Sequence, residues 1–441
     1  MTTKPTSLKR VLTATHLWAI AVGLVISGEY FGWNYGWGVA GTMGLLIATI
    51  AVTILYICFV FSFTELTTSI PQAGGPFAYA SRAFGPVGGF IAGFATLIEF
   101  LFAAPAIAFA LGSYLHFLHP SFDVLYTAIG CYVLFTVINL LGIKESAVFT
   151  LIVTLLAVGE LLLYMGIIAP QFSAERFLHN SMPFGWSGVF AALPFAIWFY
   201  LAIEGVAMVA EEAKDPRRTI PKGYISGILT LTLLALGVMI LTGGITDWNK
   251  LSNIDYPLPE SIGIVLGRQN SLTQLFAGIG LFGLVASFHS IITGYSRQIF
   301  ALARDRYLPP FLAALHPRFR TPHRALAAGG IVGMIAVCTG TTNQLIIISV
   351  LGALVMYIIS MLSLFRLRKK EPGLERPFRA PYYPWVPALA LVLSAICLAA
   401  VVYYNRMSAL VFLAAALVSI AAYLSILRTS KGRQSMINPP V

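Results

Sequence analysis

The stretch Ile26-Ser27-Gly28-Glu29-Tyr30-Phe31-Gly32 interrupts an apolar segment, residues 16–39, that is otherwise long enough to cross a membrane. Two glycines and a carboxylate in the middle of such a segment predict that its helix is broken there. A second interruption lies in the segment 186–210, where Pro194, Glu204 and Gly205 bracket the centre. Two helices broken at corresponding positions are typical of two packed repeats that enclose a binding site. Ordinary kinks are the alternative, because glycine and proline are common in membrane helices.

Apolar segments recur along the whole chain, and they decide the class of protein. Hydrophobic residues make up 58% of the sequence and charged residues only 10%, which is too few charges for a water-soluble domain. Segments of about twenty apolar residues are typical of membrane-spanning helices. We therefore predict an all-α polytopic membrane protein with 12 transmembrane helices, numbered as spans in chain order. The predicted spans are residues 16–39, 41–63, 87–115, 123–141, 147–169, 186–210, 224–244, 271–300, 325–341, 344–365, 384–404 and 409–427.

The positive charge of the chain is distributed unevenly between the two sides of the predicted bundle. The net charge is +11, and with the N-terminus inside the cell only four of the 28 Lys and Arg residues fall on the outer side. Those four are Arg176, Lys250, Arg268 and Arg406. This bias follows the positive-inside rule, so we expect cytoplasmic N- and C-termini in a bacterial inner membrane. Topology thus explains the basic charge, and no nucleic-acid partner is expected.

The two interrupted spans are five spans apart, which suggests two five-helix repeats. We expect the first repeat at residues 16–169 and the second at residues 186–366, with two appended helices within residues 384–427. Short cytoplasmic tails, residues 1–15 and 428–441, complete the predicted organisation. The sequence has no phosphate-binding loop and no HExxH motif, and its four cysteines lack zinc spacing. We expect no cofactor, no metal site and no enzymatic activity.

Carboxylates inside the predicted spans are the main candidate site residues. No Lys or Arg lies at mid-membrane to pair with them, and a charge at the bilayer centre costs about 2.5–3.5 kcal/mol. Glu29 lies in the first break, where it attracts an ammonium group and repels a carboxylate; a protonated acid bonded to a neighbouring helix is the alternative. Glu99 and Glu204 are candidates of the same kind, each with a structural hydrogen bond as the alternative. Glu65, near the end of span two, is predicted to be structural.

Two further groups of residues extend the candidate site. Trp198 and Tyr200, in the second break, offer a cation–π wall for an ammonium group, although an aromatic content of 13% makes chance placement a real alternative. Glu160 in span five is a candidate proton carrier. His289 in span eight is either part of a proton relay or a core histidine with ordinary hydrogen bonds.

Three spaced motifs occur in order along the chain. They are Pro71-Gln72-Ala73-Gly74-Gly75-Pro76-Phe77 with Ala83-Phe84-Gly85, then Ala210-Glu211-Glu212-Ala213-Lys214-Asp215-Pro216-Arg217-Arg218-Thr219-Ile220-Pro221, then Ser296-Arg297-Gln298 with Ala303-Arg304-Asp305-Arg306-Tyr307-Leu308-Pro309. With these motifs the chain resembles the amino acid–polyamine–organocation transporters over nearly its whole length. The resemblance implies a LeuT-like fold, which is a five-plus-five inverted repeat with two extra helices and discontinuous helices one and six. It also implies alternating access around a site between the two breaks.

The first break departs from the pattern of family members that bind amino acids. In those relatives it reads roughly Gly-Ser-Gly-Ile, and its backbone amides hold the substrate carboxylate, whereas this chain has an acid, Glu29, in the last position. Ala202 likewise replaces a glycine at the second break. Residues 27–34 and 192–204 resemble instead the ethanolamine permeases of bacteria, whose substrate has an ammonium group and no carboxylate.

The same resemblance implies roles for three residues. Trp198 falls where relatives carry an aromatic gate, Glu99 falls on a stretch of span three that lines the site, and Glu160 falls near a position taken by a lysine or a sodium ion in some relatives.

These observations together predict a carrier for the uptake of ethanolamine or a closely related amino alcohol. The predicted substrate-binding residues are Ser27, Gly28, Glu29, Glu99, Trp198, Tyr200, Ala202 and Glu204. Glu160 and His289 are the candidates for coupling to a proton or Na⁺, although a monovalent cation moving inward already gains about 2.3 kcal/mol per 100 mV. An amino acid permease with a protonated Glu29 is the alternative within carriers. A channel or a membrane sensor is the alternative from another class.

Overall fold

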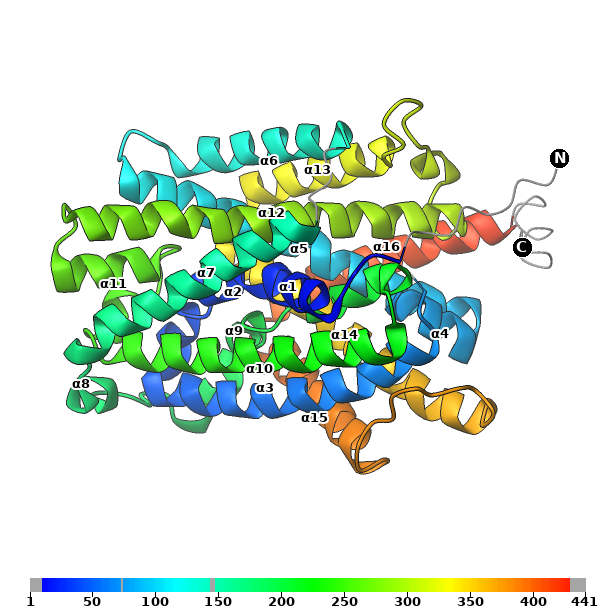
Figure 1. Cartoon of the computed structure of the whole chain (residues 1–441), viewed down its shortest axis with the longest axis horizontal. Coiled ribbons are helices and arrows are strands. Elements are labelled where there is room, and N and C mark those ends of the chain that lie inside the picture. Colours follow the sequence, from blue (N-terminus) through cyan, green and yellow to red (C-terminus); the bar gives the residue numbers. More distant parts are fainter. Residues whose placement is uncertain (1–9, 73, 143–146, 429–441) are drawn as a thin grey trace.

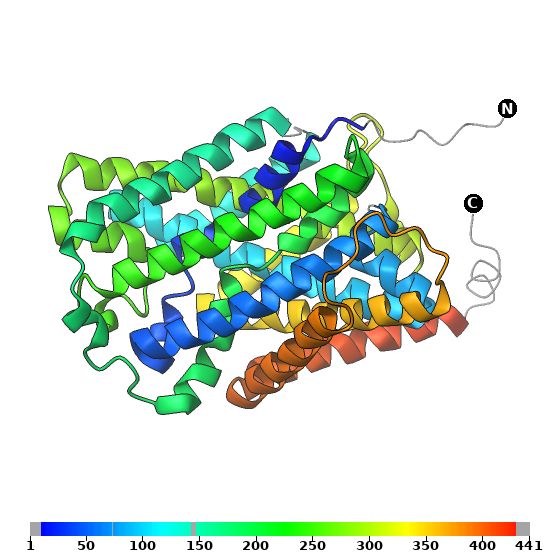
Figure 2. The same cartoon turned by 60° about the horizontal axis from the view of Figure 1, so that its bottom comes forward.

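The computed structural model describes residues 10–72, 74–142 and 147–428, and there the chain is a bundle of helices (Figure 1). Most of the long helices run along the longest axis of the molecule in both views (Figure 1 and Figure 2). Regular strands are absent from these three ranges, where one isolated bridge joins Leu12 to Ala213. The helices are α1 (Ala14–Val25), α2 (Ser27–Tyr30), α3 (Tyr35–Ser69), α4 (Pro76–Phe84), α5 (Pro86–Leu118), α6 (Val124–Leu140), α7 (Ala147–Ile168), η1 (Ala169–Gln171), α8 (Ala174–Leu178), α9 (Gly185–Trp198), η2 (Ile203–Glu212), α10 (Pro216–Gly243), η3 (Trp248–Lys250), α11 (Pro257–Leu266), α12 (Ser271–Arg304), η4 (Pro310–Ala313), α13 (His323–Thr339), α14 (Thr342–Lys370), α15 (Trp385–Tyr404) and α16 (Arg406–Arg428).

The apolar helices correspond one by one to the predicted spans. Nine helical segments of the described chain are long and apolar enough to cross a membrane by length and composition. Three shorter apolar helices, α1, α6 and α13, occupy predicted spans one, four and nine. Nine and three make the twelve predicted spans, so the prediction of an all-α polytopic membrane protein is confirmed. The remaining short apolar helix, α11, lies in the connection between spans seven and eight.

Spans one and two meet at Gly41, inside the helix α3. Gly41 has φ +71°, and a Cβ at this position would lie 2.6 Å from the carbonyl oxygen of Ser181. A left-handed backbone with so close a neighbour requires glycine. The helix is therefore interrupted at the predicted boundary between residues 39 and 41.

The two halves of the bundle show the same pattern of helix packing. α1 packs on α10 as α9 packs on α3, and α7 packs on α12 as α14 packs on α5. The short helices follow the same rule, since α4 packs on α5 and α14 while α11 packs on α12 and α7. α4 and α11 lie at opposite ends of the bundle, so the exchange of the two halves also reverses its ends, as in an inverted repeat (Figure 1). We call these ends the α4 end and the α11 end.

The last two helices lie outside this pattern. α15 packs on α3, α9 and α14, and α16 packs on α14 and α15. They therefore cover the outside of the two repeats, as expected for appended helices.

Glu65, near the end of α3 at the α4 end, is held by two arginines. Its carboxylate accepts hydrogen bonds from Arg368 at 2.8 and 2.6 Å and from the backbone amide of Ala380 at 2.7 Å, and Arg376 lies 3.3 Å away. The side chains of Glu65 and Arg376 are 1% and 9% exposed. This buried and fully paired cluster joins α3 to α14 and to the connection after it, in agreement with the structural role predicted for Glu65.

Glu65→Gln is expected to lower the stability of the folded protein by about 3 kcal/mol, because it leaves a buried arginine without its counter-charge. Thermal unfolding of the purified protein in detergent measures the effect. Glu375→Gln is the matched control, since Glu375 pairs with Arg217 at the surface, where the two side chains are 67% and 64% exposed. Exposed pairs of this kind contribute little. Equal melting temperatures for the two variants would contradict the structural role of the cluster.

Candidate functional site

The two interrupted spans are broken where the sequence predicts. α1 ends at Val25, and the four-residue helix α2 is followed by Phe31 in an extended conformation (φ −161°) and by Gly32 with φ +92°. In span six, α9 ends at Trp198, and Ala202 adopts a left-handed conformation with φ +76° before η2 begins. A broken helix leaves backbone amides and carbonyls without helical partners, and these groups become available to a ligand.

Gly28 and Trp198 bring the two breaks close together. A Cβ on Gly28 would lie 2.4 Å from the carbonyl oxygen of Trp198, so only glycine permits this approach. The indole Nε1 of Trp198 donates a hydrogen bond of 3.0 Å to the carbonyl oxygen of Phe31, and the two rings meet edge to face with centroids 5.6 Å apart. Trp198 therefore covers the first break from the side of span six.

A small cavity lies between the breaks. Its volume is about 10 Å³, the lower limit for a single water molecule, so the bundle is closed at its centre. Four of the eight predicted substrate-binding residues line it, namely Ser27, Gly28, Trp198 and Ala202. The rest of the lining is apolar and comes from α1, α5, the second break and α12: Leu24, Val25, Ala103, Ile107, Leu201 and Ile291.

Glu99 and Glu204 form a pair of carboxyl groups at the second break. Both residues are fully buried, and their carboxyl groups adjoin each other. Oε1 of Glu99 accepts a hydrogen bond of 3.2 Å from the backbone amide of Ala202. Within the described chain, Oε2 of Glu99 and both carboxyl oxygens of Glu204 accept no conventional hydrogen bond. Because adjacent buried carboxylates repel each other, this pair needs a shared proton or a bound cation.

Glu29 is fully buried in α2, and neither of its carboxyl oxygens has a hydrogen-bond partner among the described residues. Its neighbours Ser27 and Gly28 line the small cavity, but Glu29 does not. Within the same part of the chain, no Lys or Arg forms an ion pair with Glu29, Glu99 or Glu204. An unpartnered carboxylate is costly inside a membrane, which points to a proton or a cation as its missing partner.

Glu160 of α7 is connected to the first break through Tyr30. The Tyr30 hydroxyl donates a hydrogen bond of 2.7 Å to Oε2 of Glu160, and the Tyr114 hydroxyl donates one of 3.2 Å to the carbonyl oxygen of Tyr30. Tyr30 directly follows Glu29 in α2, so Glu160 is hydrogen-bonded to the residue next to Glu29. Tyr30 was not predicted as a site residue, although its place beside Glu29 in the break was a usable signal.

His289 and Tyr200 lie away from the small cavity. Nδ1 of His289 is 3.2 Å from the side-chain amide of Asn139 on α6, which is the ordinary hydrogen bonding of a core histidine. The Tyr200 hydroxyl is 2.6 Å from Oγ1 of Thr53, and its ring lies 4.9 Å from that of Tyr56 on α3. Tyr200 therefore faces span two, and neither residue belongs to the cavity lining.

Ser287 of α12 is a site residue that the sequence did not reveal. Its hydroxyl donates a hydrogen bond of 2.7 Å to the carbonyl oxygen of Gly23 and accepts one of 3.3 Å from the backbone amide of Ser27. This side chain satisfies backbone groups on both sides of the first break. A serine within an apolar span has no sequence signal that separates this role from a bond within its own helix.

The chain after the first break is also fastened to the connection between η3 and α11, at the α11 end. The side-chain amide of Asn34 donates hydrogen bonds of 2.6 and 2.8 Å to the carbonyl oxygens of Leu251 and Ile254. The carboxylate of Asp255 accepts hydrogen bonds of 2.8 Å from Tyr35 and of 2.8 Å from Thr342, at the start of α14. These bonds close the α11 end over the breaks.

Acid is expected to strengthen this closure. Burial raises the pKa of Asp255 to about 6, against the opposing effect of its two hydrogen bonds, whereas an exposed aspartate titrates near 3.9. The closed form thus binds the proton more tightly, and the closure weakens as the pH rises from about 4 to about 6. The equilibrium between closed and open forms changes about a hundredfold over this range, because the two pKa values differ by about two units and each unit is a factor of ten.

Labelling of Ser252→Cys with a water-soluble thiol reagent measures this opening, since Ser252 is 2% exposed. The control carries Ser252→Cys together with Asp255→Asn. The reactivity of the thiol with the reagent changes with pH equally in both proteins, so the ratio of their labelling rates reports the effect of Asp255. The labelling rate of the protein with Asp255, divided by that of the control, is expected to be about tenfold larger at pH 7.5 than at pH 5. A ratio of rates that does not depend on pH would rule out Asp255 as the titrating group.

Metal ligands do not gather in this region. Among the described residues, no three His, Cys, Asp or Glu side chains are arranged to hold a metal ion.

The fold and the site together define a class of protein. The described residues contain apolar helical segments that match all twelve predicted spans. Together with the inverted packing of the two halves and the two broken spans around a central cavity, these are the features of a membrane transporter. The sequence model of the family described as amino acid permease matches residues 12–426. The chain belongs to this family.

Its relatives match nearly the whole length of the chain. An uncharacterized transporter of Rhizobium meliloti (strain 1021) is 30% identical over 88% of this chain and 85% of that protein. The methylthioribose transporter of Bacillus subtilis (strain 168) is 28% identical over 90% of this chain and 88% of its own. The branched-chain amino acid permease BcaP of the same strain is 26% identical over 88% and 87%. The chain is therefore similar to transporters and a permease over most of its length.

Proposed function

We propose that this chain is a carrier that takes up ethanolamine or a closely related small amine by alternating access. The proposal rests on three fully buried carboxyl groups, Glu29, Glu99 and Glu204, which no Lys or Arg of the described chain neutralises. Negative charge in a buried site attracts an ammonium group and repels a carboxylate. The family alone does not decide the substrate, since the names of two relatives specify branched-chain amino acids and methylthioribose.

Each part of the site has a role in this proposal. Glu29 and Glu99 supply negative charge for the ammonium group, and the carbonyls freed at the first break accept its hydrogens. Ser27, Gly28 and Ala202 line the cavity, and Trp198 closes over the substrate. A volume of about 10 Å³ is too small for ethanolamine, so the two breaks must separate before the substrate enters.

A second candidate is an amino acid permease in which Glu29 is protonated. One observation favours it: Ser27 and Gly28 line the cavity, whereas Glu29 does not. By the family resemblance, the backbone at those two positions is the part that holds a substrate carboxylate.

Counterflow in proteoliposomes distinguishes the two candidates. Vesicles are loaded with an unlabelled amine or amino acid, and the entry of a labelled one is measured. Ethanolamine, choline, putrescine, alanine and glycine are compared as competitors. Competition by ethanolamine without competition by alanine or glycine supports the amine carrier. The reverse order contradicts it and supports the amino acid permease. The lack of any counterflow, with uptake that does not saturate, would indicate a channel.

Glu160→Gln tests whether a proton moves with the substrate through the Tyr30–Glu160 contact. We expect concentrative uptake to fall about tenfold at pH 6 and to lose its dependence on pH, because the variant cannot exchange a proton with the first break. Uptake driven by pH gradients of opposite direction measures the effect. His289→Gln is the control, since His289 lies against α6. Unchanged concentrative uptake and pH dependence in Glu160→Gln would exclude the relay.

We also propose that the α4 end faces the cytoplasm of a bacterial inner membrane. The four basic residues predicted outside, Arg176, Lys250, Arg268 and Arg406, belong to connections or helix ends opposite to the arginine cluster around Glu65. The repeat limits at residues 16–169 and 186–366 remain part of this proposal. Most of the two predicted tails, residues 1–9 and 429–441, lies outside the described residues.

A further inference from the structure

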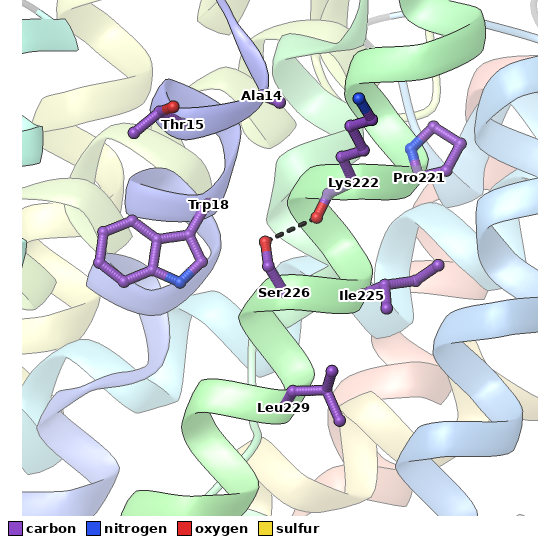
Figure 3. A pocket seen from close by; sticks show the side chains of 8 residues that line it. All are labelled: Ala14, Thr15, Trp18, Pro221, Lys222, Ile225, Ser226 and Leu229. Atoms are coloured by element: carbon purple, nitrogen blue, oxygen red, sulfur yellow. Dashed lines mark hydrogen bonds between the residues drawn. The ribbon is translucent and has the colours of Figure 1, made fainter.

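A groove of about 570 Å³ lies between α1 and α10, apart from the central cavity (Figure 3). Trp18 of α1 lines one side, and Lys222, Ile225 and Leu229 of α10 line the other. The groove opens at the surface of the bundle, where Leu229 is 55% exposed. Because both helices are predicted spans, this surface faces lipid.

The groove flanks a tight crossing of the two helices. A Cβ on Gly223 would lie 2.6 Å from the Cβ of Leu17, and one on Gly227 would lie 2.9 Å from the Cβ of Ala21. α1 and α10 are thus in direct backbone contact next to the groove. The shape of the groove is therefore built from two closely packed helices.

Two polar side chains of the groove are hydrogen-bonded within the protein, whereas its lysine has no acidic partner among the described residues. The indole Nε1 of Trp18 donates a hydrogen bond of 3.0 Å to Thr230, and the Ser226 hydroxyl donates one of 2.6 Å to the carbonyl oxygen of Lys222 (Figure 3). The ammonium group of Lys222 forms no ion pair with an acid of the described chain. The groove therefore presents one free positive charge beside an apolar wall.

The ammonium group of Lys222 and the apolar wall of the groove lie at successive depths along the membrane normal. Lys222, Ile225 and Leu229 have the spacing of one helical face, and the rise of 1.5 Å per residue places Leu229 about 10 Å deeper than Lys222. Lys222 lies within two turns of the start of α10, where the basic residues Lys214, Arg217 and Arg218 also lie. A cation at headgroup depth above an apolar channel complements a phospholipid with an anionic headgroup.

We propose that this groove binds an anionic phospholipid of the leaflet at the α4 end. Lys222 contacts the phosphate, Trp18 lies at the interface between headgroup and chains, and an acyl chain runs along Ile225 and Leu229. α1 leads directly to Leu24 and Val25 in the lining of the central cavity. A lipid held between α1 and α10 therefore supports one wall of that cavity, whichever substrate the carrier takes.

Native mass spectrometry of the purified full-length chain tests the proposal, with dioleoyl-phosphatidylglycerol and dioleoyl-phosphatidylcholine as probes at equal concentration. We expect one phosphatidylglycerol to bind more tightly than phosphatidylcholine. Lys222→Gln is expected to weaken phosphatidylglycerol binding about fivefold, the effect of one basic residue at an anionic surface. Ile225→Trp fills the groove and is expected to remove the tight site for both lipids. If Ile225→Trp does not fold, Leu229→Gln replaces it. This variant places a polar amide at an exposed position of the apolar wall and is likewise expected to remove the tight site for both lipids.

Arg218→Gln is the matched control, because it removes the same charge at the same end from a side chain that is 84% exposed and does not line the groove. It is expected to leave the tight site intact. Equal weakening by Arg218→Gln and Lys222→Gln would show diffuse attraction to the surface and would overturn the proposal. Phosphatidylglycerol binding that survives both Lys222→Gln and the filled groove would overturn it as well.

Discussion

Gly28→Ala is expected to reduce transport at least a hundredfold without preventing membrane insertion. The added methyl group would lie 2.4 Å from the carbonyl oxygen of Trp198, 3.2 Å from its carbonyl carbon and 3.4 Å from the Cα of Phe199. All three are backbone atoms, so no side-chain rotation relieves the contact. The two breaks must move apart by about an ångström, and a displacement of that size at a reacting or binding centre is known to cost about a hundredfold.

Counterflow of the best substrate, together with the melting temperature of the purified protein, measures this effect. Gly278→Ala is the matched control, since it makes the same substitution in α12, where a Cβ would have no neighbour within 4 Å. We expect that variant to transport normally and to be slightly more stable, because alanine favours a helix over glycine. Normal transport by Gly28→Ala would mean that the two breaks are not in contact during the transport cycle.

Glu29→Gln is expected to lower the affinity for ethanolamine about a hundredfold while the protein remains as stable as before or becomes more stable. Removal of one partner from a buried charge pair typically costs about 2–5 kcal/mol of binding, which corresponds to about thirtyfold to several thousandfold. The stability does not fall, because the carboxyl group has no hydrogen-bond partner among the described residues to lose.

Competition for counterflow and thermal unfolding test both halves of this prediction. Glu375→Gln, at the exposed pair with Arg217, is the control for a lost surface charge. If the unmodified protein transports alanine or glycine in preference to ethanolamine, and Glu29→Gln still transports them, Glu29 is a protonated bystander. A variant with unchanged ethanolamine affinity would shift the ammonium site to Glu99 and Glu204.

The sequence predicted the elements of the fold because those elements depend on hydrophobicity along the chain. The breaks near Gly28 and Ala202 were predicted from nearby glycine, proline and carboxylate residues, which weaken a helix at mid-membrane. Neither hydropathy nor motif spacing reports which side chains meet across spans. The contact of Tyr30 with Glu160 and that of Ser287 with Gly23 join residues more than a hundred positions apart, so they emerged only from the structure.

The direction of side chains inside a break was also beyond prediction. Helical periodicity predicts a face only where the helix is regular. Ala202 has a positive φ, and the chain around it no longer follows that period. Tyr200 consequently faces Thr53 on α3 although it was expected beside the substrate. Glu29 lies outside the cavity lining for the same reason, while the backbone at Ser27 and Gly28 lines it.

The two ends of the bundle are held together by different interactions, so they differ in their response to the surrounding solution. The α4 end relies on Glu65 with Arg368 and Arg376, a buried ion pair that bulk salt screens little. The α11 end relies on Asp255, whose protonation changes near pH 6. In the proposed orientation the variable external medium faces the α11 end, so external acidity is expected to regulate how often the carrier admits its substrate.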